Sequence, residues 1–282
     1  MFKKLIFGLS LWLFATTLIF GANFDDGYSA IEKGDYKTAF IIFEDLAKKG
    51  DIEAQFALGV TYDNGYGVRQ DYKKAIEWYE KAANQGYAPA QYNLGVMYES
   101  GLGVRQDYKK AIEWYEKAAT QGYAKAQFNL GVIYSNGKGV KQDYKKAIEW
   151  YEKVATQGYA PAQYNLGVMY HNGYGVKQDY KKAFEWTEKS ATQGDVGAQS
   201  NLGLMYYNGY GVRQDYKKAF EWTEKAATQG DVVAQSNLAL MCVKGEGVRQ
   251  DYKRAKEWFG KACDGGYQKG CDNYKKLNQQ GY

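Results

Sequence analysis

The sequence predicts an all-α protein, a solenoid built from 36-residue helix pairs. Two residue ladders carry this prediction. The tetrapeptide Gln-Asp-Tyr-Lys recurs every 36 residues, with its aspartates at Asp71, Asp107, Asp143, Asp179, Asp215 and Asp251. Tryptophan keeps the same step, at Trp78, Trp114, Trp150, Trp186, Trp222 and Trp258. A chain with such a register forms a quasi-linear array in which each unit contacts mainly its neighbours, so one globular core is not required.

The N-terminal segment, residues 1–22, has the features of an export signal. Lys3 and Lys4 supply the positive start, an uncharged and mostly apolar run covers 5–20, and small residues suited to cleavage follow at 21–22. A retained membrane anchor is the alternative, but a span needs about 20 apolar residues and this run is shorter. We expect no membrane span after cleavage.

The net charge argues against nucleic acid as a partner. The whole chain carries a formal charge of +5, and removal of the two signal lysines leaves +3. Acidic and basic residues are interleaved rather than gathered into a basic patch.

The mature chain divides into a central array and two caps. We expect an N-terminal capping helix pair over 23–50, six repeats over 51–266 and a C-terminal capping helix over 267–282. Asp35-Tyr36-Lys37 is a degenerate copy of the tetrapeptide one interval before the first complete one.

The first helix type, helix B, is predicted over 71–83. Asp71 is suited to cap its N-terminus, because its carboxylate can accept the unpaired backbone N–H groups. Ala75, Trp78 and Ala82 follow at three- and four-residue steps and form an apolar stripe. Gly86 stands just after the pattern ends, where a left-handed residue is favoured.

The second helix type, helix A, is predicted over 88–98. Pro89 is tolerated in its first turn, where a missing N–H costs little. Ala90, Leu94 and Tyr98 stack at four-residue steps. A Gly-x-Gly-Val loop then leads to the next helix B.

Residues present in every copy serve what every copy needs, which is packing. The alanines, the helix A leucine and the tryptophans belong to this class. A buried tryptophan covers about 150–250 Å², worth several kcal/mol at about 25 cal/mol per Å². We therefore expect a buried Trp–Ala seam, with a tryptophan binding ladder as the alternative.

Columns that change between copies are the better binding candidates. One runs Phe56, Tyr92, Phe128, Tyr164, Ser200, Ser236, and a second runs Asp63, Glu99, Ser135, His171, Tyr207, Val243. Seven residues separate them on helix A, so they share a face, and a column of asparagines lies beside the first. Rings supply contact area and amides satisfy main-chain groups, which suits a peptide. The candidate binding residues are Tyr92, Asn93, Phe128, Asn129, Tyr164, Asn165, His171, Asn201, Tyr207 and Asn237. The alternative is that the rings pack between helices and the amides brace loops.

These residues also carry a family resemblance. The pattern Ala-x-x-x-Leu-Gly-x-x-Tyr, Gly-x-Gly-Val, Asp-x-x-Lys-Ala, Trp-x-x-Lys-Ala-Ala-x-x-Gly resembles Sel1-like repeats, relatives of tetratricopeptide repeats, over about residues 24–280. Among exported members, the chain resembles the cysteine-rich Sel1-repeat proteins of Helicobacter and relatives. The resemblance implies a right-handed α/α superhelix whose concave face binds proteins or peptides, and some relatives carry a β-lactamase or penicillin-binding label.

The cysteines depart from that subgroup, whose members have a Cys-x7-Cys pair in most repeats. This chain has one such pair, Cys263 and Cys271, and we predict that it forms a disulfide across a helical hairpin. Cys242 stands in the column of Tyr98 and Tyr206, so we expect a buried free thiol there.

The sequence contains few of the residue motifs that a catalytic site requires. The one literal Ser-x-x-Lys motif, Ser135 to Lys138, falls in an inter-helix turn without the companion elements of serine β-lactamases. A single histidine cannot build a zinc site, and we expect no cofactor and no metal.

The sequence therefore favours a secreted or periplasmic scaffold, acting as a monomer, that binds a protein, a peptide or a cell-wall fragment. A β-lactamase-like activity is the alternative.

Overall fold

The computed structural model describes residues 21–282, and the described part of the chain is all helical, with no strand. The helices are α2 (Phe24–Glu32), α3 (Tyr36–Lys48), α4 (Ile52–Asn64), α5 (Tyr72–Asn84), α6 (Ala88–Ser100), α7 (Tyr108–Thr120), α8 (Ala124–Asn136), α9 (Tyr144–Ala155), α10 (Ala160–Asn172), α11 (Tyr180–Thr192), α12 (Val196–Asn208), α13 (Tyr216–Thr228), α14 (Val232–Lys244), α15 (Tyr252–Asp264) and α16 (Gln268–Gln279). The even-numbered helices from α4 to α14 are A helices, and the odd-numbered helices from α5 to α15 are B helices. The predicted array of helix pairs is confirmed.

The N-terminal segment is largely outside this description. The predicted export signal over 1–22 lies, except for its last two residues, outside the described residues. From residue 21 onward, no helix is long and apolar enough to cross a membrane.

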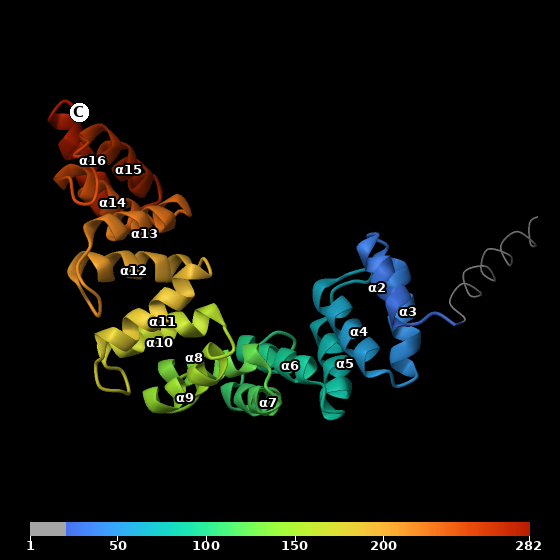
Figure 1. Ribbon diagram of the computed structural model, residues 1–282. Coiled ribbons are helices and arrows are strands. Elements are labelled where there is room, and N and C mark those ends of the chain that lie inside the picture. Colours follow the sequence, from blue (N-terminus) through green and yellow to red (C-terminus); the bar gives the residue numbers. More distant parts are fainter. Residues whose placement is uncertain (1–20) are drawn as a thin grey trace, which may run out of the picture. The chain divides into compact units, whose positions relative to one another are not determined.

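The chain forms two compact units. The first comprises the described residues up to 130 together with 138–140, and the second comprises 131–137 with 141–282. Within each unit a helix packs on the next one along the chain, as α4 does on α5 and α10 on α11 (Figure 1). The interior of each unit is therefore a seam between successive helices.

The helix ends follow the predicted capping chemistry. The Asp71 side chain accepts from the backbone N–H of Lys74 at the start of α5, and the aspartates at the same position cap the later B helices. Gly86 follows the end of α5 with a left-handed φ of 91°. Pro89 lies in the first turn of α6, where it removes no helical hydrogen bond.

The predicted buried tryptophan seam is wrong for five of the six tryptophans. Trp78 and its counterparts are half-buried, and only Trp258 is buried. A lysine three residues later covers each ring; the Lys81 ammonium lies 3.5 Å from the centre of the Trp78 ring. The residue after the tryptophan is the buried one, since Tyr79 has no exposed surface.

A ladder of buried glutamines ties the helix pairs together. Gln55 donates to the carbonyl oxygen of Ala47, and its Oε1 accepts from Gln85 at 2.8 Å. The same arrangement recurs at Gln91 in the first unit and at Gln163 and Gln199 in the second. At the next position, the buried Oε1 of Gln235 has no hydrogen-bond partner among the described residues. Gly265 occupies the repeat position of Gln85. Because glycine has no side-chain amide to donate a hydrogen bond, the ladder of glutamines ends at Gln235.

The cysteine predictions are confirmed. Cys263 and Cys271 form a disulfide with their Cα atoms 4.5 Å apart, linking α15 to α16. Cys242 is a buried free thiol on α14, and burial raises the pKa of this thiol.

Candidate functional site

In the first unit, each B helix places a tyrosine in a closed space between two A helices. The ring of Tyr79 lies over Gly59 of α4, where an added Cβ would come within 2.5 Å of it. The hydroxyl donates to Asp63 Oδ2 at 3.1 Å and is also hydrogen-bonded by Asn93 of α6. Burial, with the charge of Asp63 as a second cause, raises the pKa of Tyr79 far above its ordinary value. We call this space the tyrosine slot.

The residue in the slot changes together with the A-helix residue that faces it. The facing pairs, in chain order, are Asp63 with Tyr79, Glu99 with Tyr115, Ser135 with Tyr151, His171 with Thr187, Tyr207 with Thr223 and Val243 with Phe259. An acceptor accompanies each tyrosine, and the Tyr115 hydroxyl donates to Glu99 at 2.8 Å. Much of this variable column therefore serves the buried hydroxyl of the slot.

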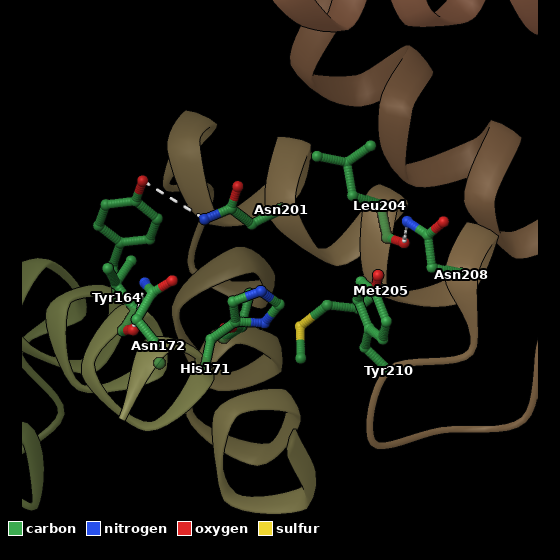
Figure 2. A pocket seen from close by; sticks show the side chains of 11 residues that line it. Tyr164, His171, Asn172, Asn201, Leu204, Met205, Asn208 and Tyr210 are labelled. Atoms are coloured by element: carbon green, nitrogen blue, oxygen red, sulfur yellow. Dashed lines mark hydrogen bonds between the residues drawn. The ribbon is translucent and has the colours of Figure 1, made fainter. Parts of the chain in front are cut away.

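Between α10 and α12 the slot lacks its ring. Thr187 replaces the tyrosine, and a Cβ on Gly167 would lie 2.4 Å from the Thr187 hydroxyl, so these two residues close the floor of the slot. The remaining space is a cavity of about 320 Å³ (Figure 2). Its lining residues are Tyr164, Gly167, Val168, His171, Asn172, Thr187, Asn201, Leu204, Met205, Asn208 and Tyr210.

The walls of this cavity are those of a tyrosine slot. Gly167, His171 and Asn201 stand three repeats after Gly59, Asp63 and Asn93, which surround the ring of Tyr79. Figure 2 shows one wall built by the α10 side chains and the other by Leu204, Met205 and Asn208 of α12. The cavity is thus a slot whose walls remain while its ring is missing.

The imidazole of His171 is held by rings. It packs edge-on against Tyr180 and Tyr210, with ring centres 5.1 and 5.5 Å away. Among residues 21–282, no group forms a hydrogen bond with its nitrogens. His171 therefore presents a nitrogen acceptor to the cavity in its neutral form.

Three amides add further acceptors around the cavity. The Asn172 and Asn208 side chains each donate to the carbonyl oxygen four residues earlier, at 2.8 and 2.9 Å. The amide nitrogen of Asn201 lies 3.4 Å from the Tyr164 hydroxyl. In all three, the amide oxygen has no partner among the described residues. No lining side chain is an acid, a lysine or an arginine.

A second hollow adjoins this one within the same unit. It has a volume of about 330 Å³ and lies over Tyr151, which fills its own slot, with Ser135 and Asn165 in the lining. Val168 lines both hollows. Together they follow the face of the second unit that the C-terminal end of α8, α10 and α12 form.

The structure brings together three of the ten predicted binding residues. Tyr164, His171 and Asn201 line the cavity, and Asn165 lines the adjoining hollow. Asn237 is half-buried on α14. These five residues belong to the second unit.

Other candidates have structural partners. The Tyr92 ring packs with Tyr115 and Tyr123, at centre distances of 5.7 and 5.4 Å, and Phe128 is half-buried on α8. Asn129 hydrogen-bonds the Tyr115 hydroxyl, as Asn93 does that of Tyr79. These contacts favour packing for the rings and bracing of buried hydroxyls for the amides.

Tyr207 points into the next repeat. Its hydroxyl donates to Glu246 at 2.8 Å and accepts from the Lys244 ammonium at 2.9 Å. This network favours a structural role for Tyr207.

Eight residues of the lining were not among the candidates from the sequence: Gly167, Val168, Asn172, Thr187, Leu204, Met205, Asn208 and Tyr210. The sequence does carry a signal for Thr187, because this residue interrupts the tyrosine column one repeat after Tyr151. The neighbouring tryptophan column carries no such signal, because its residue is the same in all six repeats.

The residues considered for catalysis have structural contacts. The Ser135 hydroxyl donates to the carbonyl oxygen of Val132 at 2.9 Å, and the Lys138 ammonium lies 3.7 Å from Glu99. In the described part of the chain, no cluster of three or more His, Cys, Asp or Glu side chains could hold a metal ion.

Comparison with known proteins agrees with this architecture. The Sel1 repeat family model matches six consecutive segments, at residues 52–87, 88–123, 124–159, 160–195, 196–231 and 232–267. A comparison with curated proteins finds no match.

Three solved structures illustrate the similarity. c5321, a protective antigen of uropathogenic Escherichia coli with an SLR fold, is 35% identical over 93% of this chain, with a TM-score of 0.85. This chain covers 60% of that one. A Sel1 repeat protein from Oxalobacter formigenes is 36% identical, over 86% of this chain and 99% of its own, with a TM-score of 0.77. Helicobacter pylori cysteine rich protein B is 27% identical over 48% of this chain and 98% of its own, with a TM-score of 0.38. With six consecutive matches to the family model, this chain belongs to the Sel1 repeat family.

Proposed function

We propose that this chain is an exported scaffold that binds a protein or an extended peptide along the face of its second unit formed by the C-terminal end of α8, α10 and α12. The observation that carries the proposal is the pair of adjoining hollows, which combine an apolar lining with unpartnered amide oxygens. An extended peptide offers the complementary groups, since its side chains fill hollows and its backbone N–H groups seek acceptors.

The apolar surface of the A helices supports this proposal. Leu204 on α12 and Leu240 on α14 occupy the same repeat position and are 37% and 38% exposed. Val168 is the α10 member of this column. Exposed apolar side chains bordered by polar groups are typical of protein interaction sites, and helix-pair arrays commonly present such extended surfaces.

Two features support export. The N-terminal segment has the charge and hydropathy pattern of a signal, and the Cys263–Cys271 disulfide is typical of oxidising compartments. Cell fractionation with N-terminal sequencing of the native protein tests this part. We expect a processed protein outside the cytoplasm, and an unprocessed cytoplasmic chain would contradict it.

Selection from a random peptide display library tests the binding surface. We expect enriched peptides to bind the wild type and to bind Val168→Glu at least tenfold more weakly, because the new charge stands between the two hollows. Thr192→Glu adds the same charge at the exposed C-terminal end of α11 and should leave binding unchanged.

If both variants lost peptide affinity equally, or if Val168→Glu kept full affinity, the proposed surface would be contradicted. Soluble cell-wall fragments serve as competitors in the same assay, and displacement of every selected peptide by them would replace the peptide with a glycan ligand. Light scattering of the purified protein tests the expected monomer.

A further inference from the structure

We infer that the cavity beside Thr187 binds a tyrosine side chain of the partner, in the place that the chain's own tyrosines occupy in the filled slots. The inference rests on the proposed function, since a bound peptide must present the ring. It goes further by naming the anchor residue that the site selects.

The filled slots show what these walls accommodate. Tyr79 and Tyr115 have no exposed surface, and each ring lies over a helix A glycine. Beside Thr187 the corresponding glycine, Gly167, is present and the ring is not. The cavity of about 320 Å³ opens between α10 and α12 instead, so a ring from outside can enter against the same two helices.

The polar groups are placed for a phenol. In the filled slot of the first repeat, the hydroxyl of Tyr79 is bonded by an A-helix acceptor, Asp63, and by an asparagine of the next A helix, Asn93. His171 and Asn201 occupy these two positions around the cavity. His171 keeps a free acceptor for the phenolic proton. The Asn201 amide has a second N–H, besides the one directed at the Tyr164 hydroxyl, that can donate to the phenolic oxygen as Asn93 does to that of Tyr79.

The charge of the site favours a neutral guest. Acidic Asp63 and Glu99 face the filled slots, whereas a histidine faces the cavity and the rest of the lining is uncharged. Burial of a carboxylate or an ammonium without a counter-charge is strongly unfavourable. A phenol, which brings a donor without a charge, matches the lining best.

The test uses single-residue probes and the whole mature chain. We expect N-acetyl-L-tyrosinamide to bind with 1:1 stoichiometry in calorimetric or NMR titrations. N-acetyl-L-phenylalaninamide should bind about three- to tenfold more weakly, as expected for loss of one hydrogen bond, and N-acetyl-L-leucinamide more weakly still. Equal binding of the tyrosine and leucine probes would overturn the inference.

Variants that exchange slot residues between repeats give the matched controls. Thr187→Tyr with His171→Glu installs the pair found at Tyr115 and Glu99, and should lower tyrosinamide affinity at least tenfold by filling the cavity. Tyr151→Thr with Ser135→His should open a second site and raise the stoichiometry toward two. Unchanged binding in the first variant, with a native helical circular dichroism spectrum, would overturn the inference.

Asn201→Leu keeps the inference testable if the filled variant does not fold. This change removes one of the two polar partners without filling the cavity, so the preference for tyrosine over phenylalanine should become smaller, and an unchanged preference would contradict the inference. The peptide assay with Val168→Glu separates a failure of the tyrosine-anchor hypothesis from a failure of the proposed binding surface. Selected peptides that are lost on Val168→Glu but need no aromatic residue would refute the tyrosine anchor alone.

Discussion

Replacement of Tyr115 by phenylalanine isolates the contribution of the hydroxyl in a filled slot. This hydroxyl donates to the Glu99 carboxylate at 2.8 Å and is also bonded by Asn129. A hydrogen bond to a charged group is worth about 1.5–3 kcal/mol. The Glu99 side chain is 23% exposed, so water can replace part of the lost bond. We therefore expect a loss of about 1.5–2 kcal/mol, at the lower end of that range.

Another repeat of the chain shows which second substitution should compensate for Tyr115→Phe. In the last pair, Phe259 occupies the slot and Val243 faces it, and both belong to one apolar cluster. Tyr115→Phe combined with Glu99→Val copies this pair and removes the carboxylate that would be left without its partner. Glu99 also pairs with Lys138 at 3.7 Å, but this exposed contact contributes about 0–1 kcal/mol. We expect the double variant to recover much of the loss, with a coupling of about 1–2 kcal/mol.

Native-state hydrogen exchange of the α7 amides is the suitable assay, because repeat arrays need not unfold as one cooperative unit. The local opening free energy should fall in each single variant and recover in the double variant. A double variant whose loss equals the sum of the two single losses would refute the coupling between slot and facing residue.

Three further predictions concern the stability contributed by Asp63, by the Cys263–Cys271 disulfide and by Gly95. Burial raises the pKa of Asp63 above its usual value near 3.8, so the folded state holds the proton more tightly and stability falls as pH rises through the interval above 3.8. Asp63→Asn should therefore raise the urea midpoint at pH 7, with the gain disappearing at pH 3. Reduction of Cys263–Cys271 should lower the stability of the α15–α16 hairpin by roughly 2–3 kcal/mol, measured by exchange of its amides with and without reductant. Gly95→Ala would place a Cβ 2.4 Å from the Tyr115 ring and should cost about 1–3 kcal/mol by overpacking, measured by urea unfolding.

The helices and turns could be predicted because local chemistry determines them. The Asp71 cap and the glycine after each B helix act within a few residues of the chain, and both occur where the sequence places them. The Cys263–Cys271 disulfide was predictable for the same reason, since a helical hairpin fixes the approach of its two ends.

The core aromatic of α5 was assigned to the wrong residue. Ala75, Trp78 and Ala82 do form a stripe, but the buried face of α5 is centred between Ala75, Tyr79 and Ala82. Trp78 lies at its edge, where one face of the ring packs and Lys81 covers the other. Sequence spacing alone cannot separate neighbouring positions on a helix, because both satisfy the same periodicity. Tertiary packing decides between them.

The site could be only partly predicted, because it forms where a threonine replaces the tyrosine ring of the slot. Tyr164 and His171 were identified by variation between repeats, and Asn201 by its place in the asparagine column beside them. The same variation also includes Tyr207, whose hydroxyl is bonded within the array. Tyr207 also faces a threonine, Thr223, so the small residue alone does not separate the two cases. The Tyr207 hydroxyl bonds to Glu246 and Lys244, whereas Tyr164, His171 and Asn201 border an open cavity beside Thr187.

A repeat array offers this route to a site because neighbouring units fix the walls of each slot. Loss of one ring from helix B, as at Thr187, leaves A helices α10 and α12 in place, since both still pack on α11 along the seam. The facing residue then no longer has a buried tyrosine hydroxyl to satisfy, so an acid is not needed there and His171 can take its position. Two changes, one on each helix type, thus convert a packed interior position into an uncharged opening without altering the helical register. The same reasoning explains why the exchange of Thr187 and His171 for the pair of another repeat should close the opening and leave the fold intact.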